Sequence, residues 1–423
     1  MTLKKTHLAV ATLLLMWILT DTQKFGNVPL VVMLIIFLIY GENLKFAKLG
    51  NMEKAILLYI GYTSFITLYY LNINPDVRNS LLLIIEYFIS LLISNFLSNK
   101  VNIPLFLKDM GSVGGFLGLL GCIEGIIRYP IWHHLLSGRL NIPNIGTSDY
   151  RTAIIFDYPI VCGGFLLFFL LCNILLPIKN NFFRYISIIG LFLAIVLNNS
   201  RSAWISLAFV LVLILFKHLH FKRTFKARWL VIIVVALLSV FLIDAIIGVN
   251  LFTLLRSYIY SRFSGMLDAG EGQIIRIETV EKSISYWMNG NLQKMFFGGG
   301  KNYDKVFLSM YPVVKGGGAF VWNGAIDNQY ITIIHESGLI GLLLILYVAI
   351  TAFKRLLCCD KDDNVAMLIN GSILSWAVVI YFYEAFNYPF VFLMIVTLCS
   401  MSDRWNSEET NYDEYFKEIK QSR

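Results

Sequence analysis

The chain has 423 residues, of which 57% are hydrophobic and 15% are charged, and its mean hydropathy is +0.68. This composition excludes a soluble globular protein, because so few charged residues cannot cover a water-exposed surface. The net charge of +8 does not indicate nucleic-acid binding, since the basic residues gather in short connections between apolar runs. The six cysteines show no paired spacing, so neither a disulfide framework nor a zinc site is predicted.

Apolar runs separated by polar or proline-containing stretches predict about twelve membrane-spanning helices. These runs lie at residues 7–20, 28–41, 55–72, 80–97, 110–128, 156–177, 182–198, 201–217, 228–247, 329–352, 366–384 and 386–401. The first run follows Lys4 and Lys5 but lacks a cleavage site of small residues, so we expect it to be retained as the first span.

Lysine and arginine residues cluster in alternate connections, which predicts the orientation of the chain in the membrane. If the N-terminus is cytoplasmic, all the basic connections lie inside, and both termini of this multi-pass cell-membrane protein are then cytoplasmic. The predicted division is a bundle of about nine spans over 1–247, a large extracytoplasmic loop over 248–328, C-terminal transmembrane helices over 329–401, and a cytoplasmic tail over 402–423.

The large loop contains the pattern of an amphipathic helix in "IIRIETVEKSISYWM". Ile274, Ile277, Val280, Ile284 and Trp287 recur at three- and four-residue steps, so one face of this helix is apolar and suited to a membrane surface. The glycine-rich "FFGGGKNYDK" that follows predicts a flexible turn. The loop is where a functional site is expected, because irregular backbone at a membrane surface requires protein or water around it.

Arginine is common on the predicted outer face, where the bias in basic residues should make it rare. The set comprises Arg128, Arg139, Arg151, Arg201, Arg256, Arg262 and Arg276. A planar guanidinium binds phosphate oxygens in pairs, so these residues suit a diphosphate at the level of the headgroups. The alternative is that each side chain reaches toward lipid phosphates or pairs with a loop carboxylate. Arg201 is the strongest candidate because Asn198, Asn199, Ser200 and Ser202 surround it with hydrogen-bonding groups.

Two acidic residues, Glu86 and Glu124, fall inside predicted spans. An ionisable group is costly there and often marks a proton or ion path. Structural hydrogen bonding within the bundle explains each of them equally well.

Three segments, in chain order, resemble the recurring segments of Wzy-type polysaccharide polymerases and the related O-antigen ligases. They are "NNSRSAWISLAFVLVL", "RIETVEKSISYWMNGNLQKMFFGGGK" and "DNQYITIIHESGLIGLLLIL". A fourth, "YRTAIIFDYPIVCGGFLL", resembles the upstream segment of the family, in which an arginine precedes a proline at the start of a span. The resemblance covers the chain from Arg151 onward.

The resemblance implies an all-α integral membrane protein with a glycosyltransferase-C-like fold, about twelve transmembrane helices and one large extracytoplasmic loop. It implies a glycosyltransferase that uses undecaprenyl-diphosphate-linked oligosaccharides on the outer face of the cytoplasmic membrane, without a metal or other cofactor. In the ligase branch the segment matching "DNQYI" usually carries His-Asn, where this chain has Asp327-Asn328. That difference favours a polymerase of O-antigen, capsule or exopolysaccharide over a ligase, and His335 is not at the aligned position.

The chemistry of such a polymerase assigns roles to particular residues. Loss of the lipid diphosphate leaves a growing negative charge, which Arg201 and Arg276, with Arg151 third, would stabilise. Asp327 would accept the proton of the acceptor hydroxyl, and Glu336 is the alternative base. Capping the following helix is the other interpretation of Asp327. Ser200, Ser202 and Asn328 complete the expected substrate-binding set.

Two other functions remain open at this point. A ligase would transfer finished glycan to an acceptor, and a flippase or transporter would move the same lipid-linked glycan. A transporter is disfavoured because the chain shows no paired repeat and no matching helix breaks. Membrane lipids are expected partners, and a chain-length regulator and a flippase of the same pathway are candidate protein partners.

Overall fold

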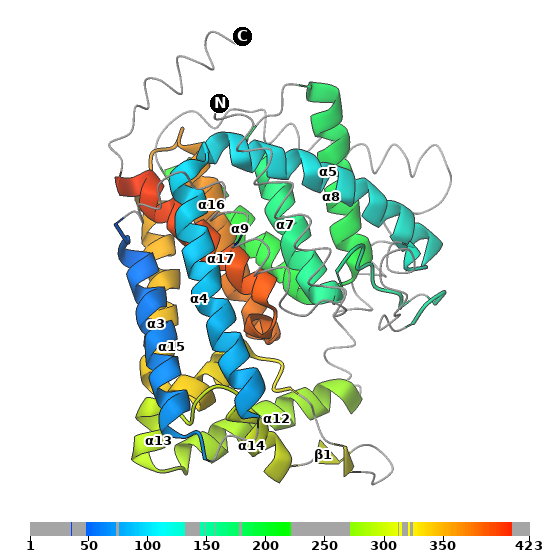
Figure 1. The fold of residues 1–423 in the computed structure, drawn as a ribbon. Coiled ribbons are helices and arrows are strands. Elements are labelled where there is room, and N and C mark those ends of the chain that lie inside the picture. The colour runs from blue at the N-terminus through cyan, green and yellow to red at the C-terminus, as the bar shows by residue number, and fades with distance from the viewer. Residues whose placement is uncertain are drawn as a thin grey trace.

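The computed structural model is a bundle of helices that carries a smaller group of short helices at one end (Figure 1). It describes residues 35, 48–72, 76–131, 144–147, 149–156, 158–176, 180–220, 271–311, 313–314, 320–321 and 325–407. The predicted spans at 7–20 and 228–247, and nearly all of 28–41, lie outside the described residues. Strands are limited, in the described part, to the hairpin of β1 (Val313–Val314) and β2 (Phe320–Val321).

Every predicted span that falls among the described residues coincides with a helix. These helices are α3 (Asn51–Tyr69), α4 (Val77–Lys100), α5 (Ile103–Ile127), α7 (Pro159–Leu175), α8 (Asn181–Asn198), α9 (Arg201–His220), α15 (Gln329–Cys358), α16 (Asn364–Val379) and α17 (Pro389–Ser407). α17 continues past the predicted end of its span at residue 401. The remaining helical elements are α12 (Glu271–Met288), α13 (Leu292–Phe297), α14 (Asp304–Met310), η1 (Ile380–Phe382) and η2 (Ala385–Asn387).

Five stretches in the described part are long and apolar enough to cross a membrane: α4, α5, α8, α15, and α16 together with η1. α7 is shorter but apolar along its whole length. The fold is therefore that of an integral membrane protein, as predicted. The total of about twelve spans and the orientation of the termini remain predictions.

α7 lies at the centre of the bundle and is buried on all sides. A helix that is apolar around its whole circumference has no face suited to water, which is why "PIVCGGFLLFFLLCNIL" occupies this place. Gly164 allows the ring of Trp376 on α16 to approach closely, and Gly163 does the same for Ala203 on α9. Phe165 stacks on Phe156 with ring centroids 4.9 Å apart. α7 thereby fixes the helices on either side of it.

Glu124 of α5 has a structural role in this packing. One carboxylate oxygen accepts hydrogen bonds from the backbone N–H groups of Ala153 and Ile154 at 2.9 and 3.0 Å. The same oxygen accepts a third bond from the Tyr150 hydroxyl at 2.9 Å. The buried carboxylate therefore holds the segment before α7. For Glu124 the sequence left open a proton or ion path and structural hydrogen bonding, and the structure shows hydrogen bonding.

The end of the bundle that carries α12, α13 and α14 is called here the loop end (Figure 1). At the opposite end Asp403 of α17 accepts hydrogen bonds from the N–H groups of Met52 and Glu53, capping α3. The same carboxylate pairs with Arg355 of α15 at 2.6 Å. A single side chain thus ties together three helices and fixes their relative height.

Candidate functional site

The loop end is organised around a break in α15 at Gly338. Gly338 has φ 60° and ψ −163°, so the helix is interrupted between Gln329–Ser337 and the longer segment that follows. A break in a membrane helix frees backbone carbonyls that water cannot reach, and they must find partners within the protein. The N–H groups of Gly299 and Gly300 supply them, donating to the carbonyls of His335 and Glu336 at 2.9 and 2.8 Å.

The glycines are required by this contact. Gly298 has φ 78°, and a side chain there would collide with the backbone carbonyl of Glu336. A side chain at Gly338 would likewise collide with the carbonyl of Phe296. Gly298, Gly299 and Gly300 are all buried. The flexible turn predicted for this segment is therefore wrong: the glycines serve close backbone packing and form a fixed cap on the broken helix.

Lys301 follows the glycines and is fully buried. Its ammonium lies 2.8 Å from one carboxylate oxygen of Glu336 and donates to the other at 3.0 Å. It also donates to the side-chain oxygen of Asn387 in η2 at 3.3 Å. Burial lowers the pKa of this lysine, but the Glu336 carboxylate reverses the effect and holds the pKa well above its usual value. The pairing with Glu336 therefore favours the charged form of Lys301 inside the protein.

The backbone of Lys301 is held as firmly as its side chain. Its N–H donates to the Thr67 hydroxyl of α3 at 2.8 Å, and its carbonyl accepts from the Ser80 hydroxyl of α4 at 3.0 Å. The side chain of Asn302 donates to the same Ser80 oxygen at 2.8 Å. Residues 301 and 302 therefore join α3, α4, α15 and η2 into one unit.

Glu336 faces this unit and is 1% exposed. Besides Lys301, its carboxylate accepts the backbone N–H of Asn302 at 2.9 Å. Both oxygens are thus engaged by fixed donors. This arrangement suits a structural anion more than an acceptor of a substrate proton.

Glu384 is a second buried carboxylate at the loop end, in the connection between η1 and η2. It accepts the N–H of Ile326 at 2.7 Å, the Thr332 hydroxyl at 2.8 Å and the side-chain amide of Asn387 at 3.2 Å. Burial raises its pKa to about 7. The contact with Ile326 fixes the backbone immediately before Asp327.

Asp327 lies half-buried between Ile326 and the start of α15. Its φ of 58° places the backbone in the left-handed region, which aspartate tolerates better than most residues. Asn328, not Asp327, caps the helix: its side-chain oxygen accepts the N–H groups of Tyr330 and Ile331 at 3.0 and 3.3 Å. The capping role considered for Asp327 is therefore wrong, and Asn328 has a structural role at a position predicted to bind substrate.

The loop end also holds another buried acid and a buried histidine. Asp304 begins α14, and burial, followed by repulsion from Glu384 and Glu336, raises its pKa well above the usual value. His335 of α15 shares a hydrogen bond of 2.6 Å with the Ser283 hydroxyl of α12 and stacks on Phe307 of α14. His335 thus attaches α12 and α14 to the broken helix.

Arg201 begins α9, directly after the turn that ends α8. Asn199 has φ 57° and closes α8, while the hydroxyls of Ser200 and Ser202 bond each other at 2.8 Å. Arg201 itself is half-buried and has interactions within the protein. The two serines that were expected to bind substrate are buried and contact one another.

The structure brings the segment of Arg151 next to the turn of Arg201. The side-chain amide of Asn198 donates to the carbonyl of Thr152, the residue after Arg151, and to that of Pro159 at 2.7 Å. Arg151 is half-buried and, like Arg201, is engaged within the protein. Arg276 lies on α12, but its side chain is outside the described part of the structure. Two of the three predicted arginines therefore lie on adjoining segments.

Three tyrosines bring the residue before α7 into contact with the residues on either side of η2. The ring of Tyr158 is 5.8 Å from that of Tyr383 and 5.2 Å from that of Tyr388, and the latter two share a hydroxyl–hydroxyl bond of 2.6 Å. Burial, with repulsion from Asp327 among the smaller causes, raises the pKa of Tyr383. Asp327 therefore lies close enough to this tyrosine cluster to affect it electrostatically. The cluster also includes Tyr158, whose neighbour Pro159 accepts the hydrogen bond from Asn198.

Sequence reasoning missed Lys301 and Glu384. Glu384 offered a signal, because it falls at the end of the apolar run 366–384, where an ionisable residue is unusual. The sequence offered no signal for Lys301 beyond its place after three glycines, because its partner Glu336 is distant in sequence. Among the described residues there is no group of three or more histidine, cysteine, aspartate or glutamate side chains placed to hold a metal ion.

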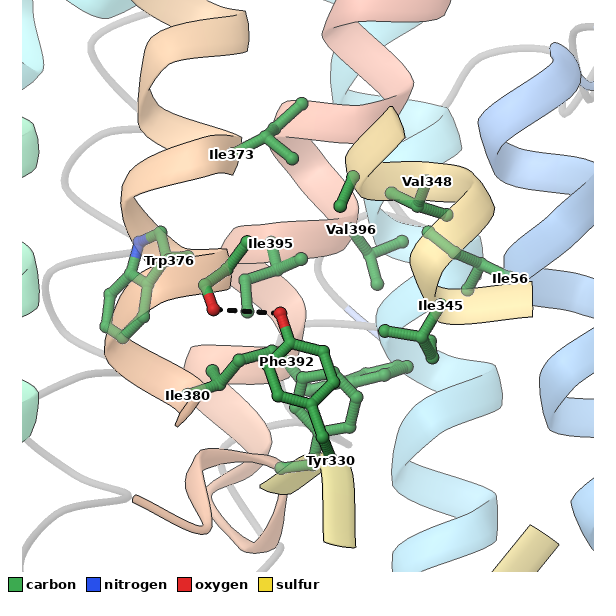
Figure 2. Close-up of a pocket in the computed structure, with 13 residues that line it drawn as sticks. Ile56, Tyr330, Ile345, Val348, Ile373, Trp376, Ile380, Phe392, Ile395 and Val396 are labelled. Atoms are coloured by element: carbon green, nitrogen blue, oxygen red, sulfur yellow. Dashed lines mark hydrogen bonds between the residues drawn. The ribbon is translucent and has the colours of Figure 1, made fainter. Parts of the chain in front are cut away.

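An apolar cavity lies beside the broken helix, between α3, α15, α16 and α17 (Figure 2). Its volume is about 30 Å³, and Ile345, Ile373, Trp376 and Phe392 are among its lining residues. Tyr330 reaches across it to donate to the carbonyl of Ala377 at 2.8 Å. The lining presents too few polar groups to perform a group transfer, so the polar residues of the loop end and of the Arg201 turn form the candidate site.

Comparison with protein families gives one match. Residues 186–346 match the family model described as O-antigen ligase. Over this range, which is less than half of the chain and which we call the ligase-like domain, the sequence is similar to that family. The matched range includes Arg201, Arg276, Asp327 and Glu336, whereas Arg151 and Glu384 lie outside it. No curated protein matches the chain.

This similarity concerns the broad class of the protein and not the role of any one residue. Members of this family are membrane-embedded ligases and polymerases of the glycosyltransferase type, and they act on lipid-linked glycans. The domain begins within α8 and ends in the first turns after the break in α15. It therefore includes both the Arg201 turn and the cap formed by Gly298–Lys301.

Proposed function

We propose that the protein polymerises undecaprenyl-diphosphate-linked oligosaccharide repeat units on the outer face of the cytoplasmic membrane. The product is a surface polysaccharide of the O-antigen, capsule or exopolysaccharide kind. The single observation that carries this proposal is the ligase-like domain at 186–346, which covers the Arg201 turn and the Asp327 segment together.

The reaction joins two lipid-linked glycans. A hydroxyl of the incoming repeat unit attacks the anomeric carbon of the growing chain, the bond from that carbon to the lipid diphosphate breaks, and the hydroxyl proton passes to a base. Charge builds on the departing diphosphate, and fixed cations in a partly dry site stabilise that charge without rearranging. Arg201 and Arg276 take this role, with Arg151 third, and no metal is needed.

Asp327 is proposed as the base. It is half-buried, it lies in a left-handed backbone conformation next to a residue whose N–H is held by Glu384, and it is not the cap of α15. Glu336, the alternative base, has both oxygens engaged by Lys301 and Asn302. These contacts support Asp327 over Glu336.

The choice of polymerase over ligase is supported by one residue difference. In the ligase branch the segment usually carries His-Asn, and this chain has Asp327-Asn328. A carboxylate in place of the imidazole changes the group next to the attacking hydroxyl. A ligase that transfers finished glycan to a separate acceptor is the alternative.

Deletion of the gene in its own host, followed by sizing of lipid-linked glycans, tests the proposal. Loss of a polymerase leaves single repeat units on the lipid and no polymer. Loss of a ligase instead leaves full-length polymer on the lipid. If neither species builds up on the outer face, and lipid-linked units build up on the inner face, the protein is a transporter and the proposal is refuted.

A further inference from the structure

An apolar surface without a partner in the described residues lies where α12 meets α13. Its side chains are Ile284, Met288, Leu292, Phe296 and Phe297, which we call the apolar elbow. Leu292 is 68% exposed and Met288 61%, values that are costly for apolar side chains in water. Ile284 belongs to the face predicted from the sequence and is exposed here. Val280 of that face instead packs inward against Phe307, Leu308, Ile326 and Ile331, and the Trp287 indole donates to the carbonyl of Met295.

α13 is held firmly against the bundle. The Tyr62 hydroxyl of α3 donates to the carbonyl of Phe297 at 2.9 Å, and the glycines that follow cap the break in α15. Lys294 of α13 lies 5.9 Å above the ring of Tyr70, just past the end of α3. The elbow is therefore fixed beside the last two turns of α3 and beside Gly338 (Figure 1).

The depth of α13 in the membrane follows from α15. From Gly338 to Lys354, an exposed basic residue near the opposite end, the helix rises about 24 Å at about 1.5 Å per residue. The hydrocarbon core of a bilayer is about 30 Å thick, and a lysine of this kind places its ammonium at the headgroups. Gly338, and α13 with it, therefore lies at or just inside the hydrocarbon boundary on the loop end.

The elbow also continues a surface that already faces lipid. On α3, Leu58, Phe65 and Leu68 are exposed along one stripe at helical spacing, and on α15 Leu343, Tyr347 and Ile350 are exposed in the same way. Phe297 joins this surface at Tyr62, one turn before Phe65. Because the apolar elbow adjoins these lipid-facing side chains at the same depth, we expect it to face lipid as well.

We propose that the apolar elbow inserts into the membrane leaflet at the loop end, as an interfacial wedge made of two short helical segments. Met288, Leu292, Phe296 and Phe297 enter the acyl chains. Asn289, Asn291 and Gln293, which are exposed in the turn and the first residues of α13, meet the headgroups. Insertion fixes the segment that carries Gly298–Lys301 and so holds the cap on α15 in place. The proposal rests on the membrane fold alone and is independent of the enzymatic activity.

Quenching by lipid measures this insertion directly. Single cysteines would replace Leu292, Phe65 as a lipid-facing reference, and Ser309 as an exposed control on α14, in a background in which Cys358→Ser removes the exposed native thiol. Each full-length variant would carry an environment-sensitive dye in nanodiscs made with phosphatidylcholine brominated on its acyl chains or with the unbrominated lipid. We expect residue 292 to lose the same fraction of its emission as residue 65, and residue 309 to lose almost none.

Two outcomes overturn the proposal. If residue 65 is quenched and residue 292 is quenched no more than residue 309, the elbow lies in water above the membrane. If residues 65 and 292 both escape quenching, another part of the protein covers them. Leu292 and Ser309 are both exposed, so neither substitution removes a buried contact, and the ultraviolet circular dichroism of each variant should match that of the parent.

Discussion

Removing the charge of Lys301 tests whether the buried ion pair organises the loop end. Lys301→Met keeps most of the length of the side chain but leaves the Glu336 carboxylate, which is 1% exposed, with only the N–H of Asn302 as a donor. An uncompensated buried charge of this kind costs about 3 to 5 kcal/mol of folding free energy. The cost should be local to the cap on α15, because Lys301 is also what connects Glu336 to Asn387.

Lys305→Met is the matched control. Lys305 is four residues further along, its side chain is 42% exposed, and it pairs with Asp76 at 3.3 Å. An ion pair as exposed as this contributes about 0 to 1 kcal/mol, so the control should behave almost like the native protein. The comparison separates the effect of burial from the loss of one positive charge at the loop end.

Thermal unfolding of the purified proteins in one detergent provides the measurement. Lys301→Met should unfold at a distinctly lower temperature than Lys305→Met, and Lys301→Met/Glu336→Gln should recover part of the loss, because the stranded charge is gone. Equal melting temperatures for the two lysine variants would refute the argument. A double variant that is no more stable than Lys301→Met would show that the lysine acts by packing and not by charge.

Four further outcomes are expected. Arg201→Lys keeps the charge but loses the planar pair of donors, so polymer formation in a deletion strain should fall by roughly 10²-fold at unchanged membrane abundance; normal polymer would show that Arg201 does not contact the diphosphate. Asp327→Asn should abolish polymer because it removes the base, and near-normal polymer would leave Asp327 without a catalytic role. Glu384 binds its proton more tightly in the folded state, with a pKa of about 7 against 4.5, so its contribution to stability is full below pH 4.5 and is lost as the pH rises to 7; Glu384→Gln should flatten the fall in melting temperature over that range. Purified enzyme should retain its activity in EDTA, and activity that returns only with added divalent metal would contradict an arginine-based mechanism.

Hydropathy predicted the helices because the requirement it detects is local. A run such as 182–198 must be helical in lipid whatever its neighbours are, since every backbone group has to be satisfied within the segment. The polar turn "NNSRS" was likewise recognisable as a helix boundary, and Asn199 does close α8 there. Elements of this kind depend on composition over one span and little on tertiary contacts.

The loop end could not be predicted in the same way. The break in α15 follows the polar residues His335, Glu336 and Ser337, but the stretch that contains them is still apolar enough on average to count as one candidate span. The partners of Lys301 come from α3, α4, α15 and η2, and no spacing in the sequence relates these elements. The glycines at 298–300 favour a turn when taken alone, and only the nearby carbonyls of α15 make them a rigid cap.

The sequence also could not predict which of two adjacent residues caps α15. Asp327 and Asn328 are both good caps, and the sequence does not choose between them. In the structure Asn328 meets the start of the helix, while a side chain distant in sequence, Glu384, holds the N–H of Ile326 just before the pair. Asn328 therefore performs the capping, and Asp327 does not.

The two halves of the candidate site are thus fixed by different physical means. At the loop end, buried charges and backbone contacts hold the segment before α15, so that Asp327 can remain half-exposed on a rigid support. At the Arg201 turn, Asn198 holds two carbonyls and thereby sets the segment of Arg151 against the start of α9. The tyrosine cluster joins the halves through aromatic contacts. A glycosyl transfer that separates charge needs a cation and a base whose positions do not drift as the bond breaks, and a rigid connection between the two halves meets that requirement.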